Sequence, residues 1–185
     1  MRASLTPREF IEKYLQIKTK NAKIELFRLN PAQTRLYDAL RAQDRAGKPM
    51  RAIVLKARQL GFSTLTEALI FHMAVTEKNR SGLIVAHRQD STRNLYAMSR
   101  RFYDGLPEEV RPMVKNSNAR EMIFDNPDKD PEKRAMKPGL GSRIRCQTAG
   151  GGAIGRGDTL QMVHASEFAF WPGQKIDTWA GIMQA

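Results

Sequence analysis

Cysteine is nearly absent from this sequence of 185 residues, in which Cys146 is the only one. A single thiol excludes an intrachain disulfide and any cysteine cluster for zinc or iron–sulfur ligation. The three histidines, His72, His87 and His164, show no metal-ligand spacing with that cysteine. We therefore expect a reducing compartment and no structural metal.

Long apolar runs are also missing. Residues 1–7 lack the apolar stretch of a signal peptide, and no later run approaches the length that crosses a bilayer. We therefore expect an intracellular protein without a membrane partner. With 41% hydrophobic and 27% charged residues, the composition is that of a globular protein, and the length suits one domain.

Acidic side chains are few, because 19 Asp and Glu stand against 31 Lys and Arg, a formal charge of +12. This excess favours a polyanionic partner, and nucleic acid fits better than a small acidic molecule. A basic surface without a defined ligand explains the charge equally well. Motifs must therefore decide between the two interpretations.

Helix and strand patterns alternate along the chain. Capping signatures at Thr6-Pro7 and Asn30-Pro31 begin two predicted helices. Helical spacing also covers residues 64–75 and 90–103. Strand patterns cover residues 24–29, 51–55, 82–86, 121–124, 142–148 and 160–165. The order predicts an α/β fold with a mostly parallel central sheet. We divide the chain into a helical lead, residues 1–50, and a core, residues 51–185.

Residues 56–64 connect a predicted buried strand to a predicted helix. Such a turn gathers backbone N–H groups and the positive end of a helix dipole, and both bind phosphate. Gly61 and Ser63 match the second glycine and the hydroxyl residue of the G-x-x-x-x-G-K-[ST] pattern. Lys56 replaces the first glycine of that pattern, and Phe62 replaces its lysine. A basic turn without a ligand is the alternative.

The predicted cofactor is ATP with Mg²⁺. Its phosphates need a cation, and Lys56 or Arg58 must supply it from the front of the loop because Phe62 cannot. The Ser63 hydroxyl would contact Mg²⁺. The remaining predicted nucleotide-binding residues of the loop are Gln59, Gly61, Phe62 and Thr64.

A nucleotide hydrolase also needs a carboxylate at the end of a neighbouring strand. Glu167 follows the predicted strand at 160–165 and would polarise the attacking water. Ser166 would hydrogen-bond a metal-bound water, although it carries no charge, and Asp158 would compensate for that. The alternative for Glu167 is a solvated carboxylate at a strand end.

Together these residues resemble the ATPase domain of phage terminase large subunits, the motors that package viral DNA into procapsids. The resemblance extends over nearly the whole chain. It is carried by Leu29-Asn30-Pro31-Ala32-Gln33, by the loop at 56–64, by Gly155-Arg156-Gly157, and by residues 164–171. It implies a P-loop NTPase-like three-layer α/β/α sandwich. The sheet would be incomplete at its C-terminal end, because family members continue with further strands and a nuclease domain.

The resemblance also implies individual roles. Gln33 would read the adenine edge, since an amide offers both a donor and an acceptor. Arg156 would join Glu167 as a catalytic residue by stabilising charge on the γ-phosphate. A helix-surface glutamine and a surface-loop arginine are the alternatives.

The implied partners are double-stranded DNA, a homo-oligomeric ring, a terminase small subunit and a portal protein, in the cytoplasm of a bacterial host. Arginines that could contact DNA phosphates are Arg88, Arg93, Arg100 and Arg101. Two other functions stay open. One is a helicase-like DNA-dependent ATPase, although Phe62 and Ser166 argue against it. The other is a non-catalytic DNA-binding or assembly module whose nucleotide site has decayed.

Overall fold

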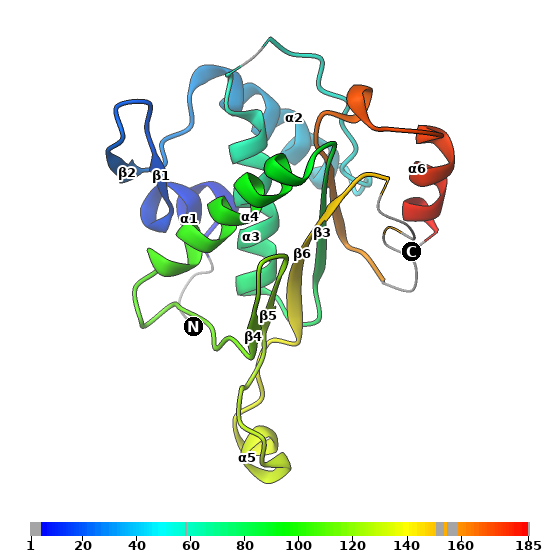
Figure 1. Cartoon of the computed structure of the whole chain (residues 1–185). Helices are drawn as coiled ribbons and strands as arrows, with labels where there is room; N and C mark the ends of the chain where they lie inside the picture. The colour runs from blue at the N-terminus through cyan, green and yellow to red at the C-terminus, as the bar shows by residue number, and fades with distance from the viewer. Residues whose placement is uncertain (1–4, 58, 151–153, 155–158, 185) are drawn as a thin grey trace.

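The chain is an α/β protein in which a five-strand mixed sheet packs against helices (Figure 1). The computed structural model describes residues 5–57, 59–150, 154 and 159–184. The strand order is β4-β5-β6-β3-β7. The strands are β3 (Ser81–Ala86), β4 (Asn116–Ser117), β5 (Glu121–Phe124), β6 (Ser142–Thr148) and β7 (Met162–Ala165). The expected parallel pairing holds for β6, β3 and β7, whereas β4 and β5 are antiparallel.

Local capping signals placed the first helices correctly. The helices are α1 (Pro7–Tyr14), α2 (Pro31–Arg45), α3 (Phe62–Thr76), α4 (Gln89–Asp104), α5 (Pro131–Met136), α6 (Lys175–Met183) and the 3₁₀ turn η1 (Phe168–Phe170). Thr6 with Glu9, and Asn30 with Gln33, form the capping boxes that begin α1 and α2. Each box satisfies backbone N–H groups that a helix start leaves without partners.

The two faces of the sheet carry separate apolar clusters. Ile84 and Ala86 of β3 belong to the larger cluster, which also contains side chains of α1, α3 and α4. Leu83 and Val85 alternate to the other face and pack with Trp171 and with Ile182 of α6. This alternation is the two-residue period of a strand that is covered on both sides.

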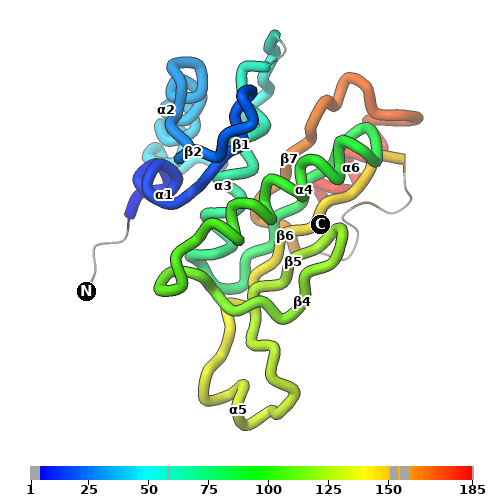
Figure 2. The backbone as a smooth tube through the Cα atoms, turned by 60° about the vertical axis from the view of Figure 1, so that its left-hand side comes forward, coloured from blue at the N-terminus to red at the C-terminus, as the bar shows by residue number. Residues whose placement is uncertain are grey.

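The N-terminal lead packs against the helix that follows the loop. Phe10, Ile11, Leu15 and Phe27 share one apolar cluster with the buried side chains of α3. Between α1 and α2, the strands β1 (Gln16–Lys18) and β2 (Ile24–Leu26) form an antiparallel hairpin of their own. Figure 2 shows this hairpin near one end of the molecule and α5 projecting from the other.

The predicted buried strand at residues 51–55 is wrong. Residues 51–57 have no regular structure, and the Ile53 and Leu55 side chains are fully exposed, at 102% and 101%. The strand after α3 is β3, and its two edges are already taken by β6 and β7. The run therefore has no place beside β3, and it does not pair with the outer edge of β7 either.

Within the described part of the chain, no helix is both long and apolar enough to cross a membrane.

Candidate phosphate-binding site

Three consecutive loop residues are held by side chains of the N-terminal lead. The Lys20 Nζ donates to Gln59 Oε1 at 2.8 Å. Asn30 Nδ2 donates to the Leu60 carbonyl at 3.3 Å, and Gln33 Nε2 donates to the Gly61 carbonyl at 2.7 Å. The start of α3 is thus fixed by α2 and by the turn of the β1–β2 hairpin. Asn30 and Lys20 were not predicted to contact this loop.

Gln33 is placed at the site, but its amide group is already occupied. The side chain is 3% exposed, its Oε1 accepts from the Asn30 N–H at 2.9 Å, and its Nε2 is bound to Gly61. An adenine edge could use only the second amide hydrogen and the second lone pair of Oε1, on a side chain that is almost fully buried. The described geometry makes Gln33 the link between α2 and the loop.

Gly61 lies against the Gln33 side chain of α2. Its φ of 73° lies in the left-handed region, and an added Cβ would lie 2.6 Å from the Gln33 Nε2. We expect Gly61→Ala to displace the start of α3 and to weaken ATP binding by about tenfold or more. Gly47→Ala is the matched control, because Gly47 has a φ of 66° but no atom within 4 Å of the added Cβ. Equal ATP affinities of the two variants, measured by calorimetry, would contradict this expectation.

The hydroxyl residues at the start of α3 differ in their contacts. Ser63 is half-buried, and its hydroxyl makes no hydrogen bond to any described residue. Thr64 donates instead to the Met98 sulfur at 3.8 Å, so it faces α4. Phe62 is the first residue of α3, and its carbonyl accepts from Thr66. Ser63 is therefore the hydroxyl that remains available for a ligand.

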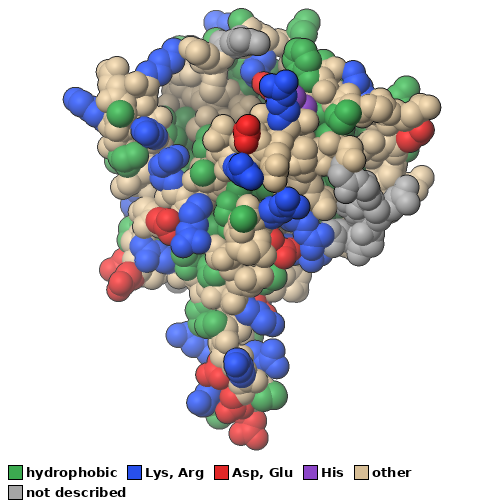
Figure 3. Space-filling view, viewed as in Figure 1, with side chains coloured by type: hydrophobic (Ala, Val, Ile, Leu, Met, Phe, Trp, Pro, Cys, Tyr) green, Lys and Arg blue, Asp and Glu red, His purple; other side chains and the backbone are tan. Residues whose placement is uncertain are grey.

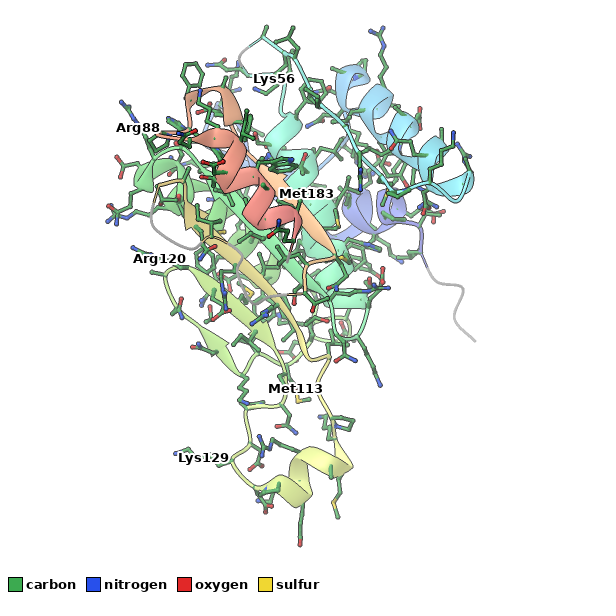
Figure 4. All side chains as sticks on the ribbon, turned by 90° about the vertical axis from the view of Figure 1, so that its right-hand side faces the viewer. Lys56, Arg88, Met113, Arg120, Lys129 and Met183 are labelled. Atoms are coloured by element: carbon green, nitrogen blue, oxygen red, sulfur yellow. The ribbon has the colours of Figure 1, made fainter. Side chains whose placement is uncertain are left out.

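The candidate cations lie in front of α3. Lys56 is exposed and has no hydrogen bond or ion pair with the residues that the structure describes. Figure 4 shows Lys56 on the loop that leads into α3, at the same end of the molecule as Arg88. Arg58, Arg156 and Asp158 lie outside the described residues.

Glu167 lies at the carboxyl end of β7, as predicted. Its side chain is about half exposed, and its φ of 51° puts a non-glycine residue in the left-handed region. Such a backbone costs about 1–3 kcal/mol, and strained residues cluster at functional sites. Gln59 in the loop, with a φ of 65°, shares this feature, as do Ala22 and Asn79 elsewhere in the chain. Ser166 is buried, and its N–H donates to the Val85 carbonyl at 2.8 Å.

His87 is the residue at this site that the sequence interpretation missed. Its Nδ1 lies 2.8 Å from Glu167 Oε2, a contact that is an ion pair only when the imidazole is protonated and that is not aligned as a hydrogen bond. The same nitrogen is buried and has no hydrogen-bond partner in the described chain. His87 directly follows β3, whose neighbour is β7, so both residues stand at the same sheet edge. Its position one residue after a buried strand was the available signal.

A second polar pair lies beneath the site. The Glu67 carboxyl on α3 is fully buried, and its Oε1 lies 2.7 Å from His164 Nδ1 on β7. Ser99 of α4 donates to the other oxygen at 3.4 Å. Burial raises the pKa of Glu67, and the His164 contact opposes that rise. A buried carboxylate within an apolar helix is costly unless it is paired.

The donor set suits Mg²⁺ only together with phosphates. No group of three or more His, Cys, Asp or Glu side chains in the described residues could hold a metal ion. Mg²⁺ usually keeps several waters and is bound through one or two carboxylates plus substrate phosphates. Ser63 and Ser166 carry no charge, so the nucleotide would have to supply the negative charge and the two serines could contribute only their hydroxyl oxygens.

A hollow of about 540 Å³ lies elsewhere, between α5 and the segment before β3. Its lining includes Lys78, Asn79, Arg134 and Gly139. The loop residues and Glu167 do not line it.

The chain was also compared with known proteins. No protein-family model matches its sequence, and no curated protein matches it.

Proposed function

We propose that this chain is an ATPase domain of the kind that drives viral DNA packaging in terminase large subunits, with a P-loop NTPase-like fold. The observation that carries the proposal is the arrangement at the carboxyl edge of the sheet. A loop held by Gln33 leads into α3, and Glu167 stands against His87 at the ends of the neighbouring strands β7 and β3. A bound nucleotide and an attacking water need these two elements together.

The residues divide the chemistry between them. Backbone N–H groups at the start of α3 would hold the β- and γ-phosphates, and Lys56 or Arg58 would offset their charge. Bound Mg²⁺ would neutralise charge that develops on the phosphates, with Ser63 and Ser166 holding it directly or through water. Glu167 would take a proton from the attacking water. The water oxygen would bond to the γ-phosphorus as the bond to ADP breaks and ADP leaves. His87 would hold the Glu167 carboxylate toward that water.

Duplex DNA is the proposed macromolecular partner. Figure 3 shows Lys and Arg side chains spread over one face of the molecule, with Asp and Glu between them. Arg93 and Arg100 on α4 are each paired with a carboxylate, Asp90 and Asp104. Arg88 before α4 is exposed and lies at the nucleotide end of the molecule (Figure 4). A homo-oligomeric ring, a small subunit, a portal protein and the bacterial cytoplasm belong to the same proposal.

One observation favours a second function. Residues 51–57 leave the phosphate loop without a strand behind it, and the loop depends on the N-terminal lead for support. A non-catalytic DNA-binding or assembly module would tolerate this, whereas a motor needs a rigid loop. Calorimetry with Mg·ATP separates the two, because absence of ATP binding by the intact chain would overturn the ATPase proposal and leave the module.

The cation is tested by comparing Lys56→Ala with Phe62→Ala. We expect Lys56→Ala to weaken ATP binding about tenfold or more, because it removes a charge-assisted contact to phosphate. Phe62 has no charge to offer, so Phe62→Ala should change ATP affinity much less. Titration of both variants with ATP and with AMP measures the difference, which should be larger for ATP. Equal losses would mean that the loop is aligned wrongly with the phosphate-binding pattern.

A further inference from the structure

The buried pair Glu67–His164 joins the helix that begins at the loop to the strand that ends at Glu167. Glu67 and His164 are 97 residues apart in the chain, and their contact is 2.7 Å. The Glu67 side chain is 0% exposed and the His164 side chain 12%, so the pair is not a surface ion pair. Replacing such a pair by apolar side chains often leaves stability unchanged, which makes conformational specificity the effect to examine.

Two contacts fix how α3 lies on the sheet. An added Cβ at Gly82, near the start of β3, would meet the Ile70 side chain at 2.5 Å. Glu67 contacts His164, which pairs with Ile84 of β3. Glu67 is therefore level with Ile84, two residues beyond Gly82, where Ile70 lies. α3 therefore runs antiparallel to β3 and β7, with its first residues at their carboxyl ends.

The next step along both elements reaches the proposed metal site. Ser63 lies four residues before Glu67, on the same face of α3 and about 6 Å along the helix axis. Ser166 lies two residues after His164, on the same face of the chain and about 6.6 Å further along. Its N–H still bonds to Val85, so Ser166 continues the register of β7 on β3. The step from Glu67 to Ser63 and the step from His164 to Ser166 are thus nearly equal in length, and both run toward the carboxyl edge of the sheet.

We infer that Glu67 and His164 are positioning residues that set the register of α3 on β7 and thereby place Ser63 across from Ser166. The inference about the metal rests on the proposed function, whereas the inference about register does not. A slip of α3 by one helical turn would move Ser63 by about 5.4 Å, beyond the reach of one ion shared with Ser166. A specific polar contact prevents such a slip, because leaving a buried carboxyl unpaired is unfavourable.

Register is tested by cross-linking in the intact chain. Ser63→Cys with Ser166→Cys should form a disulfide rapidly in diamide, because the oxidant can add to the half-buried thiol at position 63 and the thiol at position 166 then displaces it. Cys146 is 0% exposed and should not react. The matched control is Thr64→Cys with Ser166→Cys, because Thr64 faces α4. Adding Glu67→Leu and His164→Leu to the first pair should slow the cross-link about tenfold, since the fixed geometry is lost. The unfolding midpoint in urea shows whether that variant is folded.

The cross-linking rates of the folded variants distinguish a positioning role of Glu67 and His164 from a purely structural one. A folded Leu pair that cross-links at the original rate would overturn the inference, because the pair would then have only a structural role. If the Leu pair does not fold, Glu67→Met with His164→Met makes the same comparison with more adaptable side chains. Glu67→Gln should keep the original rate, because its amide still hydrogen-bonds His164. Loss of the cross-link in a folded Glu67→Gln variant would also overturn the inference.

A second readout connects register to the metal. We expect Mg²⁺ to strengthen ATP binding by the original chain, and the Leu pair to lose that gain while it binds ATP without Mg²⁺ as before. If the original chain binds no ATP, the proposed function fails while the cross-linking result stands. If Mg²⁺ still strengthens ATP binding by the Leu pair, the positioning role toward the metal is overturned.

Discussion

Glu167→Gln is expected to remove ATP hydrolysis and to leave ATP binding intact. The carboxylate is the proposed acceptor of the water proton, and loss of a general base typically costs ~10²–10⁴-fold in rate. The amide has the same size and can still contact His87, so the site should keep its shape. Phosphate release with and without duplex DNA measures the rate, and calorimetry with Mg·ATP measures binding.

The control for Glu167→Gln is Glu108→Gln, the same change at an exposed position away from the sheet edge. It should leave both quantities unchanged. Hydrolysis by Glu167→Gln at the original rate would show that another group accepts the proton. Loss of ATP binding together with hydrolysis would show that Glu167 supports the fold of the site, which would weaken its assignment as the base.

Local signals explain which parts of the fold could be predicted. Thr6 and Asn30 cap their helices with side chains that lie within three residues of the groups they bind, so the sequence contains the whole interaction. Residues 51–55 have strand composition, yet pairing depends on an edge contributed by distant residues. β3 offers no edge because β6 and β7 flank it, and the run does not pair with the outer edge of β7. The same dependence on distant pairing explains why the strand pattern at residues 121–124 did not show that β5 pairs antiparallel with β4 and β6.

At the candidate site, too, features set by neighbouring residues could be predicted, whereas features set by distant pairing could not. Glu167 was placed at a strand end because it directly follows an apolar run, and the structure puts it there. His87 was missed because its role depends on β3 and β7 being neighbours, which spacing along the chain does not show. Glu67 had a signal that went unused, since it is the one acidic residue among the apolar positions of α3. The nucleotide roles of Gln33 and Lys56 stay predictions.

His164→Ala is expected to have the largest effect on stability. It leaves the Glu67 carboxyl buried without its main partner, and breaking a buried pair from one side costs about 3–5 kcal/mol. Replacing both residues by Leu should cost much less, because no charge is then left in the core. Urea denaturation of the original chain and both variants measures the free energies of unfolding.

The dependence of this loss on pH separates charge from lost packing. Burial raises the pKa of Glu67 in the folded chain above its ordinary value of 4.5. A group with a raised folded pKa stabilises the protein fully below 4.5, and that contribution is lost as the pH rises through the folded pKa. Without His164, the contact that lowers the Glu67 pKa is gone and this pKa rises further. The stability of the variant therefore continues to fall at a higher pH than that of the original chain. The loss of unfolding free energy caused by His164→Ala should therefore be smaller near pH 5 than near pH 8. The loss caused by the Leu pair should not grow with pH, because that variant has no carboxyl at position 67. A deficit that is constant over this range would assign the effect to the cavity left by the imidazole.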